Sequence, residues 1–308
     1  MSQPQQTVSL PVDPRYQQRI RDILAEADFA FTDAPHAFYR AKGTGCVAVF
    51  YRSGKLVLQG PNAQTLAAVL GLEEPAVPHA QEPVEQYAAA LALHPDPKPD
   101  AWIGSDEVGK GDFFGPLVAV AVRVERDRVE LLAELGVADS KTLGDKRIRA
   151  IAVDLRHAVQ HKAVIIGPTA YNSLYAKMRN LNDLLAWAHA RAIEDVLAVA
   201  PAPYAVVDRF AKEHVLRGKL MAAGRELHLD QRPRAEDDPA VASASILARD
   251  AFLSRMQALS KEAGFTIPRG AGPPVLAAGR RLVERHGPAA LGRFAKLHFK
   301  TTKQILGH

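Results

Sequence analysis

"GSDEVGKGDFFGPL", residues 104–117, sets two adjacent acids at the end of an apolar strand and follows them with closely spaced glycines. Two carboxylates about 4 Å apart repel each other by ~4 kcal/mol at an effective dielectric constant near 20. Such a pair is tolerated where water solvates it or where a divalent cation lies between its members. Whether other strands also end in acids decides between these two explanations.

Two further apolar runs do lead to acids. "YAVVDRF" reaches Asp208, and "ELHLDQRPRAEDD" leads into Glu236, Asp237 and Asp238. Taken alone, Asp208 is equally consistent with a cap at a strand-to-helix turn. Asp238 before Pro239 has the pattern of a helix N-cap with proline at the first helical position, so we assign it to capping and keep Glu236 as the candidate ligand. Carboxylates from three segments at one sheet edge suit Mg²⁺ or Mn²⁺, and two such ions about 4 Å apart can activate a water and stabilise the leaving oxygen of a phosphodiester.

A nucleotide-binding phosphate loop is the competing interpretation of the same glycines. The spacing Gly104-x4-Gly109-Lys110 satisfies most of that pattern, which requires Ser or Thr at the next position. The next residue is Gly111, and the two acids would lie inside a loop that has to cradle phosphates. Both departures count against a phosphate loop.

The chain divides into a small unit and a larger one. Residues 15–27 predict an amphipathic helix, and runs 46–51 and 56–59 around Ser53-Gly54 predict a hairpin. A second helix follows and is stopped by Gly71. Two proline clusters around a short helical piece mark a linker. We therefore predict an N-terminal domain at 1–72, a linker at 73–100 and a catalytic domain at 101–308.

The larger unit has the pattern of an α/β domain. Two adjacent strands are followed by strands that alternate with helices, which predicts a mixed sheet covered by helices. The predicted strands are "AWIGSDEV", "GPLVAVAVRV", "KAVIIGP", "YAVVDRF" and "ELHLDQR", and the predicted helices lie at 144–159, 182–199, 211–223 and 240–262.

Bulk properties are those of a globular protein of ordinary composition. The 308 residues are 47% hydrophobic and 24% charged, with a net charge of +5, which permits a polyanionic partner without requiring one. The one cysteine, Cys46, excludes an internal disulfide and has the surroundings of a small buried residue. The chain shows no secretory signal and no apolar run of ~18 residues, so we expect a cytoplasmic protein that does not bind membranes, and we expect a monomer.

Several long motifs resemble the type 2 ribonucleases H, and the Val-Gly-Lys-Gly-Asp form of the opening stretch is similar to the ribonuclease HIII branch. The resemblance continues through "GVADSKTLGDKRI", "AYNSLYAKMRNLNDLLAWAHARAI", "VVDRF", "RAEDDPAVASASILARDAFL" and "FAKLHFKTT", and so covers residues 101–302. It implies an RNase H-like fold with a small α+β, TBP-like substrate-binding domain, because "FYRSGKLVLQG" resembles that branch. It also implies that a metal-binding acidic set serves catalysis, at Asp106, Glu107, Asp208 and Glu236.

The resemblance assigns substrate contacts as well. The backbone of Gly109-Lys110-Gly111 is expected to contact the 2′-hydroxyl that distinguishes RNA from DNA. Ser140 and Lys141 match a motif near the substrate, and we favour contact with a phosphate. Asn182 and His189 lie seven residues apart on one helical face, where packing and substrate contact are equally consistent.

Two clusters of basic residues can be explained either as ordinary solvated surface or as sites of contact with nucleic acid. Three tail lysines read as such a face or as a patch that follows the nucleic-acid backbone: Lys296, Lys300 and Lys303. Four hairpin residues suggest a basic surface on the small domain, although many of them fit ordinary solubility charges: Arg40, Lys42, Arg52 and Lys55.

We therefore expect an endoribonuclease that cuts the RNA strand of RNA–DNA hybrids by a two-metal-ion mechanism, leaving 5′-phosphate and 3′-hydroxyl ends. One rival is an enzyme of the ribonuclease HII kind that cuts at single ribonucleotides in DNA. The other is a hybrid-binding module with an inactive site. Enzymes that cut at single ribonucleotides carry a tyrosine shortly after "SILA", and here Ala251 stands at that place, with Phe252 next.

Overall fold

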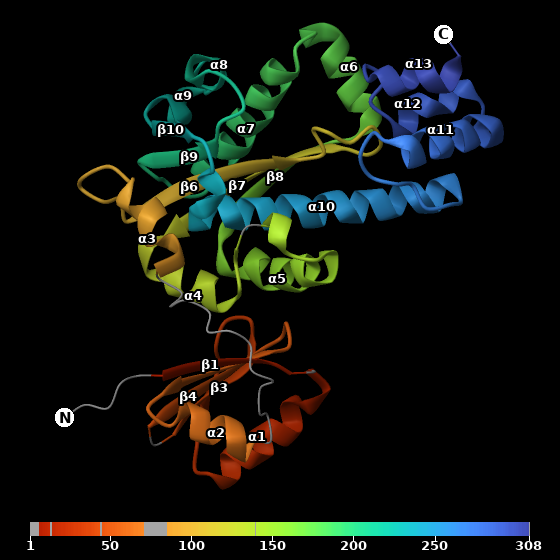
Figure 1. Cartoon of the computed structure of the whole chain (residues 1–308). Helices are drawn as coiled ribbons and strands as arrows, with labels where there is room; N and C mark the ends of the chain where they lie inside the picture. The colour runs from red at the N-terminus through yellow and green to blue at the C-terminus, as the bar shows by residue number, and fades with distance from the viewer. Residues whose placement is uncertain (1–5, 13, 44, 71–84, 139, 308) are drawn as a thin grey trace.

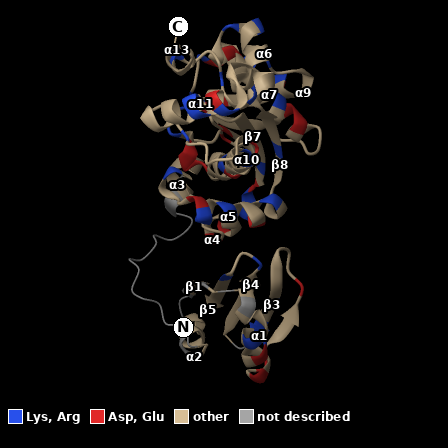
Figure 2. Cartoon of the chain, turned by 90° about the vertical axis from the view of Figure 1, so that its right-hand side faces the viewer, with Lys and Arg blue, Asp and Glu red and all other residues tan. Residues whose placement is uncertain are grey.

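The computed structural model describes residues 6–12, 14–43, 45–70, 85–138 and 140–307, which form a small N-terminal unit and a larger unit (Figure 1). The predicted stop of the second helix at Gly71 lies outside these residues. No helix in the described ranges is long and apolar enough to cross a bilayer. In the view of Figure 2, basic and acidic segments are interspersed over the larger unit.

The small unit is a five-stranded antiparallel sheet with two helices on one face. Its strand order is β1-β5-β4-β3-β2. The helices cover the face that carries Tyr39, Phe50 and Leu58, and α1 contributes Ile20 and Leu24 to this core. Its elements are β1 (Gln6–Pro11), α1 (Gln17–Glu26), β2 (Ala30–Thr32), β3 (Ala37–Gly43), β4 (Cys46–Tyr51), β5 (Lys55–Gly60) and α2 (Ala63–Val69).

The predicted helix–hairpin–helix is therefore incomplete, because three strands extend the hairpin into a sheet. β1 pairs with β5, and β3 pairs with both β4 and β2. β2 has three residues, and the β3–β4 register shifts between Ala37 and Tyr39. A strand of three residues gives little local periodicity, which explains why the sequence does not reveal β2.

The larger unit is built around a mixed five-stranded sheet, as the sequence predicts. The order is β10-β9-β6-β7-β8, in which β6, β9 and β10 are parallel and β7 is antiparallel to both of its neighbours. The first part of this unit comprises α3 (Glu85–Ala92), β6 (Ala101–Val108), β7 (Leu117–Glu125), α4 (Val129–Glu134), α5 (Asp145–Ala158), β8 (Gln160–Ile166), α6 (Pro168–Met178) and α7 (Leu181–Leu197). The second part comprises β9 (Tyr204–Asp208), α8 (Glu213–Arg217), α9 (Ala222–Arg225), β10 (His228–Arg232), α10 (Pro239–Ala263), α11 (Pro273–His286), α12 (Leu291–Phe294) and α13 (Lys300–Leu306).

Helices cover both faces of this sheet. α10 packs on β6 and β7 from one side, with α5 beyond it, and α7 packs on β7 and β8 from the other (Figure 1). The contact of α10 with β6 is so close that a Cβ at Gly104 would come within 2.2 Å of the Ala240 backbone. The helix predicted at 211–223 is instead two short helices, α8 and α9, and α4, α6 and α11–α13 lie in segments that the sequence analysis leaves unassigned.

Residues 85–100, which the sequence assigns to the linker, pack against the larger unit. The Tyr87 hydroxyl donates a 2.6 Å hydrogen bond to the carbonyl of Val137. The His94 ring lies 2.7 Å from the Asp238 carboxylate at the start of α10. α3 is thus part of the larger unit, because its buried side chains have their partners there.

One face of the small sheet turns toward α4 and α5. Tyr51 and Val57 share a buried cluster with Val129 and Leu132. Lys55, expected on a basic surface, lies between the units, where burial and Arg147 lower its pKa to about 8 against the opposing effect of Glu134 and Asp154. The other three basic residues of the predicted surface are exposed: Arg40, Lys42 and Arg52.

Candidate active site

The predicted acids come from three consecutive places along one edge of the sheet. β6 pairs with β9 in parallel up to Ser105 and Val207, so Asp106 and Asp208 are the next residues of neighbouring strands. Glu236 lies in a 3₁₀ turn, η4 (Ala235–Asp237), directly after β10. The Asp208 carboxylate accepts from the Ala235 amide at 3.4 Å, which ties η4 to the end of β9.

The electrostatics of these acids are those of a crowded negative site. Burial raises the pKa of Asp106 to about 7, and the charge of Glu107 adds to the increase. Burial also raises the pKa of Asp208, with contributions from the charges of Glu236 and Glu107. Asp106 and Asp208 thus each experience the charge of a neighbouring carboxylate, as groups that share a cation or a proton do, whereas Lys141 lowers the pKa of Glu236 against the effect of burial.

His189 has a role that the sequence left open between packing and substrate contact. Its Nε2 donates to Glu107 at 3.0 Å, and its Nδ1 lies 2.7 Å from the Ser105 hydroxyl. Burial alone would raise the pKa of Glu107, but the hydrogen bond and charge of His189, together with Lys110, lower it. His189 thus orients Glu107 and keeps it ionised. Asn182 is exposed, and its backbone N–H donates a hydrogen bond to the side-chain oxygen of Asn180.

The donor set fits a hard divalent cation in chemistry, because all four side chains are carboxylates and their mutual repulsion would fall around a metal ion. Two of them face lysines in this structure: Glu236 pairs with Lys141 at 2.8 Å, and Glu107 lies 3.8 Å from Lys110. Over the described ranges, no group of three or more His, Cys, Asp and Glu side chains is arranged as it stands to hold a metal ion. Binding a metal at these four carboxylates would therefore require their side chains to rearrange.

The two glycines of the loop after β6 differ in what the protein itself requires. Gly109 has φ +96°, and a Cβ there would lie 2.2 Å from the Pro116 carbonyl oxygen, so the fold demands glycine. At Gly111 a Cβ would meet nothing within 4 Å. The exposed Lys110 lies between them. The protein's own packing gives no reason for glycine at 111, which is consistent with space kept for a substrate.

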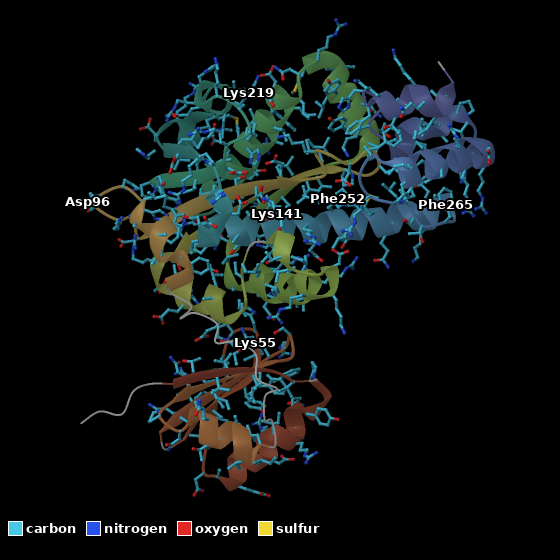
Figure 3. The ribbon with its side chains drawn as sticks, viewed as in Figure 1. Lys55, Asp96, Lys141, Lys219, Phe252 and Phe265 are labelled. Carbon is cyan, nitrogen blue, oxygen red and sulfur yellow. The ribbon has the colours of Figure 1, made fainter. Side chains whose placement is uncertain are left out.

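Phe252 packs against the loop after β6, and the preceding residue, Ala251, has no aromatic ring for stacking. Phe252 lies on α10 (Figure 3). Its ring is buried, and a Cβ at Gly109 or Gly115 would contact it after the closest neighbour. Ala251 is partly buried and packs against the same core. Neither residue therefore offers an exposed aromatic ring at this place on α10.

Ser140 and Lys141 lie beside the acids but differ from the expectation of two phosphate contacts. The Ser140 side chain is buried, and its hydroxyl lies 2.7 Å from that of Ser245. Lys141 is 72% exposed and reaches Glu236. Ser140 therefore belongs to the packing of α10 as it stands, whereas Lys141 remains at the surface of the site.

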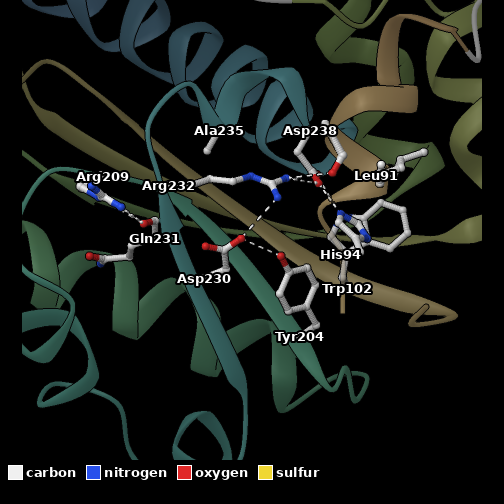
Figure 4. Close-up of polar contacts among 12 residues, drawn as sticks. Leu91, His94, Trp102, Tyr204, Arg209, Asp230, Gln231, Arg232, Ala235 and Asp238 are labelled. Atoms are coloured by element: carbon white, nitrogen blue, oxygen red, sulfur yellow. Dashed lines mark hydrogen bonds and ion pairs between the residues drawn. The ribbon is translucent and has the colours of Figure 1, made fainter. Parts of the chain in front are cut away.

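Asp238 caps α10, as its position before Pro239 predicts, and it also anchors a buried network (Figure 4). One carboxylate oxygen accepts from the Ala240 amide and from the Trp102 indole, both at 2.9 Å. The other lies 2.7 Å from His94 and accepts from Arg232 at 3.3 Å. The network fixes the N-cap of α10, which lies two residues after Glu236.

The three tail lysines have different environments. Lys300 and Lys303 are exposed on α13, as expected of a solvated or backbone-tracking face. Lys296 is fully buried, and its Nζ donates to the carbonyls of Asp112 and Gly115 at 2.8 and 2.9 Å. The interpretation of Lys296 as a surface charge is therefore wrong, because two carbonyls of the loop after β6 accept hydrogen bonds from its Nζ inside the fold.

The family models and the most similar curated relatives indicate the same protein family. The family model described as "Ribonuclease HII" matches residues 103–302, and a "Domain of unknown function (DUF3378)" matches residues 8–83. Ribonuclease HIII of Protochlamydia amoebophila (strain UWE25) is 38% identical over 299 residues, which are 96% of this chain and 95% of that one. Ribonuclease HIII of Chlamydia pneumoniae is 39% identical, over 94% of each chain.

A solved structure agrees with these relatives. The crystal structure of Bst-RNase HIII in complex with Mn²⁺ is similar to this chain with a TM-score of 0.65 at 31% identity, over 98% of each chain. This similarity confirms the predicted fold, an RNase H-like α/β unit with a small α+β unit before it.

Proposed function

Because this chain belongs to the ribonuclease HIII family and is thus a ribonuclease H-type nuclease, we propose that it cuts the RNA strand of RNA–DNA hybrids. The observation that carries the proposal is the gathering of four carboxylates at one edge of the sheet: Asp106, Glu107, Asp208 and Glu236. Their mutual electrostatic influence supports a common role as ligands and catalytic groups.

These four residues would hold Mg²⁺ or Mn²⁺, and two ions would activate a water and stabilise the leaving oxygen. The relative crystallised with Mn²⁺ supports a divalent cation. In the reaction, the water oxygen forms a bond to phosphorus and the bond from phosphorus to the 3′ oxygen breaks. The water gives its proton to solvent and the 3′ oxygen gains one, so the products carry 5′-phosphate and 3′-hydroxyl ends.

Other residues of the chain bind and orient the groups that react. His189 keeps Glu107 ionised and fixed. The backbone of Gly109-Lys110-Gly111 contacts the 2′-hydroxyl, and the open space at Gly111 supports this assignment. Lys110 and Lys141 offer cations to phosphates at the rim of the site. Ser140 contributes to substrate binding indirectly, through the hydrogen bond between its hydroxyl and that of Ser245 on α10.

The small unit, which we place at residues 1–72, serves as a TBP-like platform for the duplex. The exposed cations of β3, Arg40 and Lys42, are available for phosphates, whereas Lys55 is not in this arrangement. The catalytic domain follows the linker, and α3 belongs with it. A monomer acting in the cytoplasm remains our expectation from the sequence.

Cleavage of labelled duplexes tests the proposal directly. A long RNA–DNA hybrid, a DNA duplex with one embedded ribonucleotide and an all-DNA duplex are incubated with Mg²⁺, Mn²⁺ or EDTA. We expect metal-dependent cleavage of the hybrid with 5′-phosphate products. Hybrid binding without cleavage in any metal would instead identify an inactive binding module, and equal cleavage of the first two duplexes would indicate an enzyme of the ribonuclease HII kind.

A further inference from the structure

The loop after β6 is held at its far end by residues from the C-terminal part of the chain. The Gly115 amide donates to the Phe294 carbonyl at 2.9 Å, and the Lys296 amide donates to the Phe113 carbonyl at 2.8 Å. A third segment adds to this, because the Phe113 amide donates to the Gly270 carbonyl at 2.9 Å. Residues 112–115 thus form a fixed stem, and residues 109–111 form the tip.

The Lys296 side chain completes the stem from inside. Its Nζ bonds to two carbonyls of one turn, those of Asp112 and Gly115, and lies 5.6 Å from the centre of the Tyr171 ring. Among the described residues, no carboxylate oxygen lies within 4.0 Å of this Nζ. Burial lowers the pKa of Lys296 to about 7, and the charge of Asp112 opposes the decrease.

A buried ammonium group without a carboxylate partner is expensive, and a methionine of similar length would fill the same space without that cost. A lysine is therefore needed here as the hydrogen-bond donor to the two carbonyls, since an apolar side chain would remove both of these hydrogen bonds. The neutral amine also carries two N–H groups, so both bonds survive in either protonation state.

The tip that this stem supports is open. Gly111 has nothing within 4 Å of a Cβ position, and Lys110 is exposed. A fixed stem below an open backbone edge is the arrangement that preorganises a backbone group for a ligand.

We propose that Lys296 is a positioning residue that fixes the stem at Asp112 and Gly115 and so aims the backbone of residues 109–111 at the substrate's 2′-hydroxyl. Lys296 touches neither substrate nor metal, and it acts on the choice between RNA and DNA. This inference rests on the proposed function, because it assumes that the tip reads the 2′-hydroxyl.

Two substitutions separate the donor function of Lys296 from its charge. Lys296→Met removes every N–H donor, whereas Lys296→Gln removes the charge and keeps two N–H donors on a slightly shorter side chain. Lys219→Met and Lys261→Met are matched controls, because those lysines are exposed and lie outside the loop after β6 and the C-terminal tail. Circular dichroism and thermal unfolding establish that each full-length variant is folded.

The readout is the ratio of affinities for an RNA–DNA hybrid and an all-DNA duplex of the same sequence, measured in EDTA so that neither is cut. A misplacement of ~1 Å in a positioning group can cost about a hundredfold, so we expect Lys296→Met to lower the ratio by about tenfold. Lys296→Gln should fall between Met and the wild type, and the two controls should keep the wild-type ratio. In Mg²⁺, KM for the hybrid should rise more than kcat falls.

Other outcomes overturn the inference. Folded Met and Gln variants with an unchanged ratio would show that the stem does not aim the tip, and an equal loss of affinity for both duplexes would indicate general damage. Failure of both variants to fold would assign Lys296 to stability alone. The wild-type protein tests the proposed function separately, because a wild type without preference for the hybrid refutes that function before any Lys296 variant is compared.

Discussion

Replacing Asp106 by asparagine should abolish cleavage and at the same time stabilise the protein. The unfolded chain releases this proton near the ordinary pKa of 3.8, whereas the folded chain keeps it until about pH 7. Between these values the folded state binds more protons, so the Asp106 contribution to the free energy of unfolding falls as pH rises across the window and stays constant above it. Asparagine removes the ionised form and therefore this loss.

The magnitude follows from the separation of the two pKa values. At about 1.4 kcal/mol per pH unit, a pKa of about 7 against 3.8 corresponds to roughly 4 kcal/mol above pH 7. The Asp106 side chain is only partly buried, so solvent screens its interactions. The value of roughly 4 kcal/mol is therefore an upper bound, and we expect the substitution to stabilise the protein by about 2 kcal/mol. The amide oxygen of asparagine can still accept the 2.8 Å bond from the Glu107 backbone, which keeps the local geometry.

The measurement is urea unfolding of the wild type and Asp106→Asn at pH 8 and pH 5.5 in EDTA. The variant should be more stable at pH 8, and its advantage should shrink at pH 5.5. Mg²⁺ or Mn²⁺ should stabilise the wild type more than the variant. Asp195→Asn is the control, because Asp195 lies in an exposed pair with Arg191 and should change little at either pH.

Activity completes the test of Asp106. Hybrid cleavage should be lost, while hybrid affinity should stay within a few-fold, since phosphate contacts supply most of it. A variant that is no more stable than the wild type at pH 8 would refute the argument that ionised Asp106 destabilises the folded protein. A variant that cuts at the wild-type rate would refute the assignment of Asp106 as a metal ligand.

Three further predictions concern the substrate. Gly111→Ala should unfold like the wild type but raise KM for the hybrid, whereas Gly109→Ala should be less stable because of its positive φ and the Pro116 carbonyl; an unaffected KM in the first variant would contradict a substrate contact at 111. Because Ala251 offers no ring for stacking, worth ~1–3 kcal/mol, a long hybrid should be cut at least tenfold more efficiently than DNA with one ribonucleotide, and equal rates would contradict this. Removing residues 1–72, which leaves α3 in place, should weaken hybrid binding and lower the salt slope by ~0.9 for each lost phosphate contact; unchanged affinity and slope would show that the small unit is not a platform.

The sheet of the larger unit and its three longest predicted helices, α5, α7 and α10, were predictable because their signals are local, whereas the shorter helices were not. The strand at 101–108 has the predicted bounds, and the cap at Asp238 marks the start of α10. The convergence of Asp106 and Asp208 also follows from the sequence, since parallel strands in register bring their ends to one edge.

The interactions that the sequence could not reveal depend on segments far apart in the chain. The helical face of His189 was predictable, but its partners Ser105 and Glu107 come from another element. His94 was placed in a linker because prolines flank it, although Asp238 holds it in the larger unit. Lysine is expected at the surface, and only the carbonyls of a distant turn explain why Lys296 is inside.

The bond between Lys296 and Asp112 joins residues 184 positions apart, which has a consequence for how the enzyme comes into being. During translation, all four acids leave the ribosome before residues 294–296 are made, and the growing chain can pair its sheet while the loop after β6 still lacks its support. Closing a contact of such long range is expected to be a late event in folding. If the stem aims residues 109–111 as proposed, a nascent chain carries its acidic cluster before it can select RNA over DNA, and selectivity is acquired only when the last part of the larger unit has docked.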